Sequence, residues 1–239
     1  MIKYAFFDVD QTIYPGYSAN DFINTSVEEG FCEKIMRERM NAVIEDLTNG
    51  ELNYHDASQE IMNILGDITE GKKENEVDEI VDKLIEKVGF VEWFIPLYED
   101  LKREGYEIYL VSGGASFIIE RLAENIDSEI KVISTEYKID LEGRYYTHAH
   151  PIINGQIKAD KIREIITKEK TQEVFSIAFG DSEGDIPMLN EVNQGYLYLP
   201  GDKEKVSELA RESGYVVFNE TGKVEINRGP EESETDQIS

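Results

Sequence analysis

Cysteine and positive charge are both scarce in this 239-residue chain. Cys32 is the only cysteine, so no intramolecular disulfide can form, and we expect it to lie in a helix as a packing residue. Lys and Arg together number 24 against 50 Asp and Glu, which gives a formal net charge of −26. Because nucleic acids and anionic membranes are held through Lys and Arg, this balance argues against both as partners.

Long apolar runs are missing as well. No stretch approaches the roughly 20 residues that a membrane-spanning helix needs, and the apolar stretch at the N-terminus is too short for a signal peptide. We therefore expect a cytoplasmic protein. Hydrophobic residues still make up 40% of the sequence and charged residues 31%, proportions typical of a globular protein.

Short, almost entirely apolar runs that end at a polar residue predict buried β-strands. Three are clear and two are weaker: 4–7 before Asp8, 108–111 before Ser112, 175–179 before Gly180, and then 131–134 and 195–199. Helical patterns occur between them, at 94–103, 117–124, 162–167 and 203–212. Strands that alternate with helices indicate an α/β fold with a doubly wound, Rossmann-like parallel sheet.

One long segment, residues 15–90, breaks this alternation because it has helical patterns and no convincing strand. Its apolar residues form three stripes at helical spacing: Met36, Met40, Val43 and Leu47; Tyr54, Ala57, Ile61, Leu65 and Ile68; and Val77, Val81, Leu84 and Val88. We expect Asn75 to cap the third helix. The predicted organisation is a core of residues 1–14 and 91–224, a helical cap of residues 15–90, and a mobile acidic tail of residues 225–239.

Residues near 145–150 suggest a short β excursion. His148 and His150 occur there at a spacing that could bind a metal, but no cysteine or carboxylate accompanies them. We interpret them as structural residues.

Polar residues follow each of the three clear strands. Asp8 and Asp10 follow the first, Ser112 the second, and Asp181 with Asp185 the third. Because open α/β sheets bind ligands at the carboxyl ends of their strands, we expect these side chains to converge. Carboxylates brought together in one crevice need a cation, and oxygen ligands suit Mg²⁺.

Two further features suit a phosphoryl group. Ser112 is followed by two glycines that we expect to open a helix, so a hydroxyl and unobstructed amides would be available there. Lys158 lies at the start of another predicted helix and could neutralise phosphate charge. Lys161 competes for this role, and we prefer Lys158 because Lys161 falls one turn inside the helix.

Four ordered segments resemble the motifs of the haloacid dehalogenase superfamily, and they resemble phosphoserine phosphatases most. They are Asp8-Val9-Asp10-Gln11-Thr12, Ser112-Gly113-Gly114, Lys158-Ala159-Asp160 and Gly180-Asp181-Ser182-Glu183-Gly184-Asp185. The resemblance implies a Mg²⁺-dependent phosphatase that acts on a small phosphorylated metabolite through an aspartyl-phosphate. It also implies a helical cap inserted after the first motif.

The resemblance also implies a role for each matching residue. Asp8 is the nucleophile, and Asp10 is the acid and base. Lys158 bridges Asp8 and the phosphate, while Ser112 and Gly113 hold phosphoryl oxygens. Asp8, Asp181 and the main-chain carbonyl of Asp10 bind Mg²⁺, with Asp185 supporting that shell.

The sequence departs from the family pattern at two places. Gln11 stands where many relatives have a small residue. Phosphoserine phosphatases carry an acidic residue in the flap after the first motif, whereas Tyr17 lies near that place here and no carboxylate occurs before Asp21. We take Tyr17 and Arg37 as candidate specificity residues.

Four other functions stay open from the sequence alone. They are phosphotransfer to an acceptor other than water, phosphoserine phosphatase proper, dehalogenation, and a catalytically silent regulatory domain. Intact Asp8 and Asp10 count against a silent domain. Dehalogenases need neither Asp10 nor a metal, so Asp10 and Asp181 count against dehalogenation.

Overall fold

The computed structural model describes residues 1–148, 152–168, 172–200 and 214–219. Its main sheet has six strands in the order β3-β2-β1-β6-β7-β8, and every neighbouring pair is parallel. The strands are β1 (Ile2–Phe7), β2 (Tyr106–Ala115), β3 (Lys131–Thr135), β6 (Val174–Gly180), β7 (Gln194–Tyr198) and β8 (Val216–Phe218). The predicted α/β sheet is confirmed.

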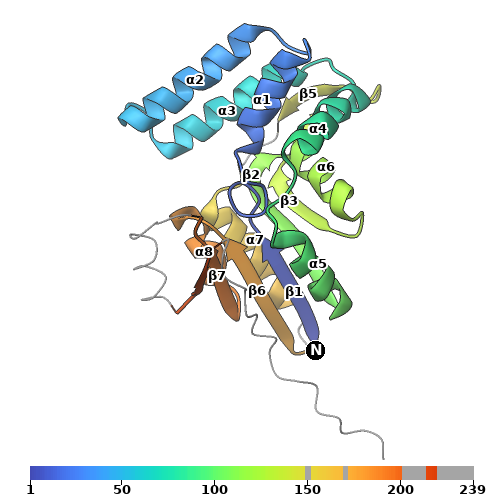
Figure 1. Ribbon diagram of the computed structural model, residues 1–239, viewed down its shortest axis with the longest axis vertical. Helices are drawn as coiled ribbons and strands as arrows, with labels where there is room; N and C mark the ends of the chain where they lie inside the picture. The colour runs from blue at the N-terminus through green and yellow to red at the C-terminus, as the bar shows by residue number, and fades with distance from the viewer. Residues whose placement is uncertain (149–151, 169–171, 201–213, 220–239) are drawn as a thin grey trace, which may run out of the picture.

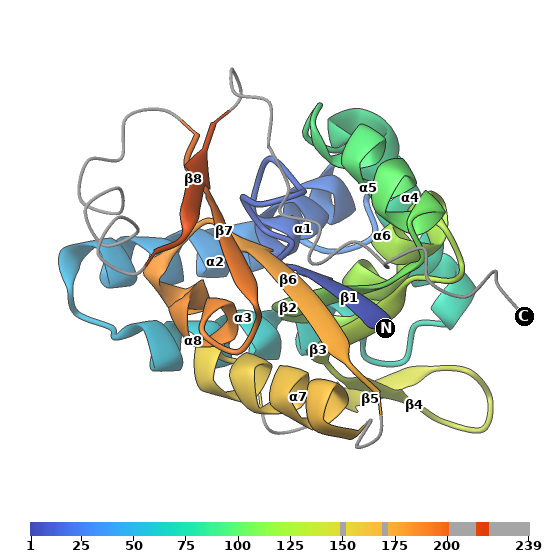
Figure 2. The same ribbon diagram turned by 90° about the horizontal axis from the view of Figure 1, so that it is seen from below.

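Helices cover both faces of this sheet, as Figure 2 shows. The helices α5 (Phe94–Arg103) and α6 (Ser116–Ile126) pack on one face, where Ala5 and Phe7 of β1 point. The helices α7 (Gly155–Lys168) and α8 (Ile186–Leu189) pack on the other, with Tyr4 and Phe6. Because side chains of a strand alternate between faces, a short strand that is apolar throughout needs cover on both sides.

Four helices lie together beyond the carboxyl edge of the sheet, at the top of Figure 1. They are α1 (Ser18–Glu28), α2 (Lys34–Asn49), α3 (Tyr54–Thr69) and α4 (Glu74–Val88). Most of the predicted stripe residues are buried among them, including Met40, Val43, Leu65, Val81 and Leu84. Within the described ranges, no helix is both long and apolar enough to cross a membrane.

Three details of the helical prediction are wrong. Lys73, and not Asn75, is the N-cap residue of α4, because the helix begins at Glu74 and leaves Asn75 inside its first turn. Tyr54, predicted as the first residue of the second apolar stripe, is 75% exposed because it lies at the very start of α3. Cys32 lies in the connection between α1 and α2, where the chain reverses after Gly30.

The predicted β excursion is an antiparallel hairpin of β4 (Tyr137–Ile139) and β5 (Tyr145–His148). Main-chain hydrogen bonds join the hairpin to the connection between α3 and α4. Gly71 N–H donates to the Tyr145 carbonyl at 2.7 Å, and Tyr145 N–H donates to the Lys72 carbonyl at 3.0 Å. His150, the predicted helix 203–212 and the predicted tail 225–239 lie outside the described residues.

Gln11 adopts a left-handed backbone conformation in the turn after Asp10, with φ of 63°. Its N–H donates to the Gly16 carbonyl at 3.1 Å, which closes the turn. The left-handed region places the Cβ of an L-residue too close to its own backbone, whereas glycine has no such atom. This explains why glycine would be easier to accommodate at position 11.

We predict that Gln11→Gly raises the free energy of unfolding by about 0.5 kcal/mol, because relief of left-handed strain exceeds the entropy that glycine adds to the unfolded chain. Gln59→Gly in the middle of α3 is the matched control and should lower it by about 1 kcal/mol. Urea denaturation measures both. A loss of stability in Gln11→Gly would show that the turn is not strained.

Candidate active site

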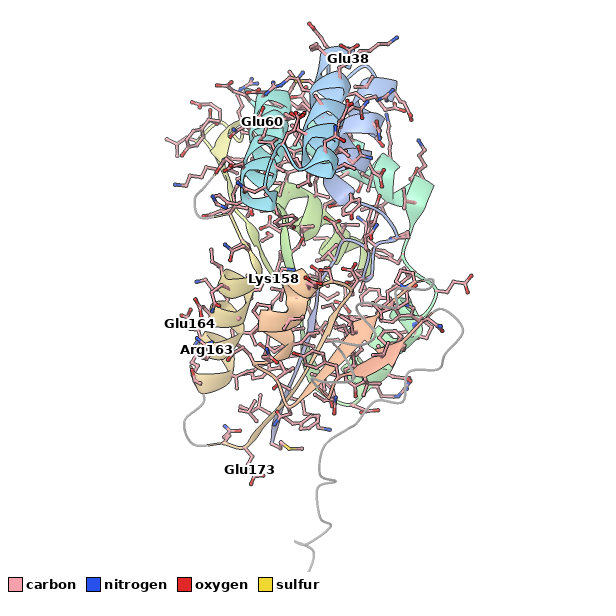
Figure 3. The ribbon with its side chains drawn as sticks, turned by 90° about the vertical axis from the view of Figure 1, so that its left-hand side faces the viewer. Glu38, Glu60, Lys158, Arg163, Glu164 and Glu173 are labelled. Atoms are coloured by element: carbon pink, nitrogen blue, oxygen red, sulfur yellow. The ribbon has the colours of Figure 1, made fainter. Side chains whose placement is uncertain are left out.

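The carboxyl ends of the central strands bring the predicted polar residues to one edge of the sheet. Asp8 directly follows β1, Asp181 follows β6, and Asp185 ends the short 3-10 helix η1 (Glu183–Asp185). Lys158 reaches them from the first turns of α7. Figure 3 shows it where the α/β layers meet the region of α1–α4.

Lys158 joins two of the carboxylates in a buried network. Its Nζ lies 2.5 Å from Oδ1 of Asp8 and 2.9 Å from Oδ1 of Asp185. The three residues are only 7%, 6% and 2% exposed. Lys161, the alternative considered from the sequence, instead lies on the exposed side of α7 and pairs with Glu164 at 3.6 Å.

The start of α7 can lie close to η1 because residue 155 is glycine. A Cβ atom at this position would lie 2.3 Å from the Gly184 carbonyl oxygen, which no side chain tolerates. Asn154 caps the helix by accepting from Ile157 N–H at 3.0 Å. This close approach sets the distance that Lys158 must span to reach Asp185.

Thr12 is a site residue to which sequence reasoning assigned no role. Its fully buried hydroxyl donates to Oδ2 of Asp8 at 2.9 Å and lies 3.4 Å from Oδ1 of Asp181. Its position four residues after Asp8 was the available signal, because the tight turn through Gln11 folds Thr12 back onto the strand end. Thr12 therefore orients Asp8 and lies beside Asp181.

Both oxygens of Asp185 accept hydrogen bonds from the protein. Oδ1 accepts from Lys158, and Oδ2 accepts from Ser182 Oγ at 2.9 Å and from the main-chain N–H groups of Asp181 and Ser182 at 3.2 Å. Asp185 thus holds the loop that carries Asp181. This arrangement fits a supporting role better than direct metal ligation.

The site carries an excess of negative charge. Burial, followed by the charge of Asp185, raises the pKa of Asp8, while the Lys158 ammonium opposes the shift. Oxygen atoms of Asp8, Asp181 and Asp185 all lie within 4.8 Å of one another. Three buried carboxylates face one ammonium group, so a divalent cation with a preference for oxygen ligands fits this site.

Asp10 lies beside this cluster with its side chain turned toward α1. Its Oδ1 accepts from Ser18 N–H, in the first turn of α1, at 2.8 Å. Burial raises the pKa of Asp10, and the bonds from Ser18 oppose that shift. A carboxyl group with a raised pKa at the edge of the site suits proton transfer.

Ser112 and Gly113 lie within β2, and not at the start of a helix as the sequence suggested. The strand continues to Ala115 with a shift of register, and α6 begins only at Ser116. The reason is that β3 still pairs with this stretch, through Ala115 and Thr135. Ser112 is buried, and its Oγ accepts from Gly114 N–H at 3.0 Å.

The two candidate specificity residues lie in different places. Tyr17 is 60% exposed, and partial burial of its phenol, together with the charges of Asp181 and Asp10, raises its pKa. It therefore lies within electrostatic reach of the site. Arg37 is held between α1 and α2, where it donates to the Asn24 carbonyl at 2.9 Å and lies 3.9 Å from Glu28, away from the site.

Tyr54, for which the sequence suggested only a packing role, lies within electrostatic range of the site. Partial burial raises the pKa of its phenol, and the charges of Lys158, Asp8 and Asp185 act on it. Nothing in the local pattern signalled this position, because it depends on how α3 is placed over the sheet.

Comparisons with known proteins agree with this geometry. A model of the haloacid dehalogenase-like hydrolase family matches residues 5–190. The chain is 25% identical over 213 residues to the inhibition of morphological differentiation protein of Streptomyces azureus, covering 87% of this chain and 75% of that protein. It is 23% identical over 202 residues to a phosphoserine phosphatase of Lactococcus lactis, covering 80% and 88%.

A solved structure of a protein of unknown function from Bordetella pertussis has the same fold. It matches with a TM-score of 0.76 at 18% identity, over 92% of this chain and 99% of that one. Phosphoserine phosphatases are among the proteins to which the chain is similar. Because the family model covers most of the chain, the chain belongs to the haloacid dehalogenase-like hydrolase family.

Proposed function

We propose that this protein is a Mg²⁺-dependent phosphatase that hydrolyses a small phosphomonoester through an aspartyl-phosphate on Asp8. The observation that carries the proposal is the buried contact of 2.5 Å between Lys158 and Asp8 at the carboxyl end of β1. A carboxylate held there by an ammonium group and a hydroxyl is oriented for attack on phosphorus. Membership of a hydrolase family supports this assignment.

Asp8, Asp181 and the main-chain carbonyl of Asp10 would hold the Mg²⁺ ion, and Asp185 would support them. When bound, the ion would neutralise charge on the phosphoryl oxygens and on the crowded carboxylates. Lys158 adds positive charge at Oδ1 of Asp8. The Ser112 hydroxyl and the Gly113 amide would hold phosphoryl oxygens.

The reaction then takes two displacements at phosphorus. An oxygen of Asp8 forms a bond to phosphorus while the ester P–O bond breaks, and the leaving oxygen takes a proton from Asp10. In the second step Asp10 removes a proton from water, whose oxygen attacks the same phosphorus. The bond to Asp8 breaks, which releases inorganic phosphate, restores the Asp8 carboxylate and leaves Asp10 protonated for the next turnover.

Water is our proposed acceptor, and phosphotransfer to another acceptor is the second candidate. Phosphoserine is disfavoured as substrate because Tyr17 occupies the flap where an acidic residue would meet the substrate ammonium. The net charge of −26 argues against nucleic acid and anionic membranes as partners. We propose a small phosphorylated metabolite as partner and a cytoplasmic location.

We predict that Asp8→Asn lowers turnover of a chromogenic phosphate ester by about a thousandfold or more, because an amide cannot form the acyl phosphate. Circular dichroism would verify that the fold is retained. Turnover above a tenth of the parent's value would contradict the role of Asp8 as the nucleophile. Parent protein that hydrolyses no phosphate ester with Mg²⁺ would instead support a silent domain.

We predict that Asp181→Ala weakens Mg²⁺ binding by about tenfold to a hundredfold, because it removes one of the proposed oxygen ligands. Glu183→Ala is the matched control, since Glu183 is an exposed carboxylate in the same loop and should bind Mg²⁺ like the parent. Calorimetric titration gives both affinities. Equal affinities in the two variants would remove Asp181 from the metal site.

We also propose that residues 15–90 act as a cap that selects the leaving group. Tyr17→Ala should change the ranking of kcat/KM among phosphorylated metabolites and leave hydrolysis of a small artificial ester within about threefold. Tyr146→Ala, on the exposed side of β5, is the control and should change neither. An unchanged ranking in Tyr17→Ala would place selectivity in the core.

A further inference from the structure

Thr135, the last residue of β3, makes two hydrogen bonds that no part of the proposed mechanism uses. Its hydroxyl donates to the Gly113 carbonyl at 2.8 Å and accepts from Ile153 N–H at 3.1 Å. The side chain is fully buried. A buried hydroxyl that satisfies two main-chain groups from different segments fixes their separation.

The Gly113 carbonyl belongs to the same peptide unit as Gly114 N–H. Because the peptide is planar and trans, these two groups point in opposite directions. Gly114 N–H donates to Ser112 Oγ at 3.0 Å. One rigid peptide unit is therefore held at its oxygen by Thr135 and at its hydrogen by Ser112.

These contacts form a continuous chain of donors and acceptors. It runs from Ile153 N–H through the Thr135 hydroxyl and the glycine peptide to the Ser112 oxygen. A serine oxygen that accepts in this way still has its own proton to donate. Each hydrogen bond in such a chain polarises the next, so the Ser112 hydroxyl becomes a better donor.

This chain of hydrogen bonds depends on a close approach of the segments that contain Gly113 and Ile153. A Cβ atom at Gly113 would lie 2.8 Å from the Ile153 carbonyl oxygen, so a side chain there would force the two segments apart. Beyond Ile153, the Asn154 carbonyl accepts from Lys158 N–H at 2.8 Å. Thr135 therefore connects the loop of Ser112 to the start of the helix that carries Lys158.

We propose that Thr135 is a positioning residue that directs the Ser112 hydroxyl, as a hydrogen-bond donor, toward the phosphoryl group. The proposal rests on the proposed function, because it takes the phosphate to lie against Ser112. A phosphate oxygen is an acceptor, so a serine whose lone pair is already occupied by Gly114 N–H is oriented correctly for it. Thr135 itself touches no reacting atom.

The test measures binding of inorganic phosphate to the full-length, Mg²⁺-loaded protein by calorimetry. Thr135→Val keeps the shape of the side chain and removes the hydroxyl, and we expect about tenfold weaker phosphate binding. Thr135→Ser keeps the hydroxyl and should bind phosphate within about twofold of the parent. If Thr135→Val does not fold, Thr135→Cys replaces it and should weaken binding severalfold, because a thiol is a poor donor.

A double-mutant cycle separates this role from a general structural one. Ser112→Ala should weaken phosphate binding, and adding Thr135→Val should then have little further effect, because both changes interrupt one chain. Thr69→Val is the matched control. That buried hydroxyl donates to the Leu65 carbonyl at 2.9 Å within α3, and its removal should leave phosphate binding unchanged.

Two results would overturn the proposal: parent-like phosphate binding in Thr135→Val, or fully additive effects of the two substitutions. Parent-like binding in Ser112→Ala would have a different meaning. It would show that Ser112 does not bind phosphate, which contradicts the proposed function itself. The hydrogen bonds through Thr135 would then have no role in phosphate binding.

Discussion

The burial of Lys158 between two carboxylates is the constraint on which the rest of this structure depends. Desolvation of an ammonium group and of each carboxylate costs several kcal/mol, and only close, well-oriented partners offset it. The contacts of 2.5 and 2.9 Å with Asp8 and Asp185 require β1, η1 and α7 to be placed accurately relative to one another. Close packing at Gly155 and the hydrogen bonds of Asp185 provide that placement.

This constraint also explains why the polar residues at the strand ends act as one unit. Removing either partner of a buried ion pair leaves a charge without compensation, which is far more costly than losing an exposed pair. The exposed pair of Lys161 and Glu164, 3.6 Å apart, contributes little by comparison. The hydroxyls of Thr12 and Ser182 donate to the second oxygen of Asp8 and of Asp185, which Lys158 does not contact.

Sequence reasoning located the sheet because buried parallel strands are short and apolar on both faces. Residues 4–7, 108–111 and 175–179 all fall inside observed strands, and Asp8, Asp181 and Lys158 do converge. The misses have a common cause. The extension of β2 past Ser112, the contact of Thr12 with Asp8 and the place of Tyr54 are set by neighbours far away in sequence, which no local pattern contains.

The β4–β5 hairpin has a consequence for how this protein could be recombined with its relatives. Its main chain at Tyr145 is hydrogen-bonded to Gly71 and Lys72 in the connection between α3 and α4, although about seventy residues separate the two segments in the sequence. If residues 15–90 alone were replaced by those of a relative, the new connection between α3 and α4 would have to form its hydrogen bonds with a β5 strand, at Tyr145, from a different parent. The two segments therefore form one exchangeable unit, and a functional chimaera would have to inherit both from the same parent.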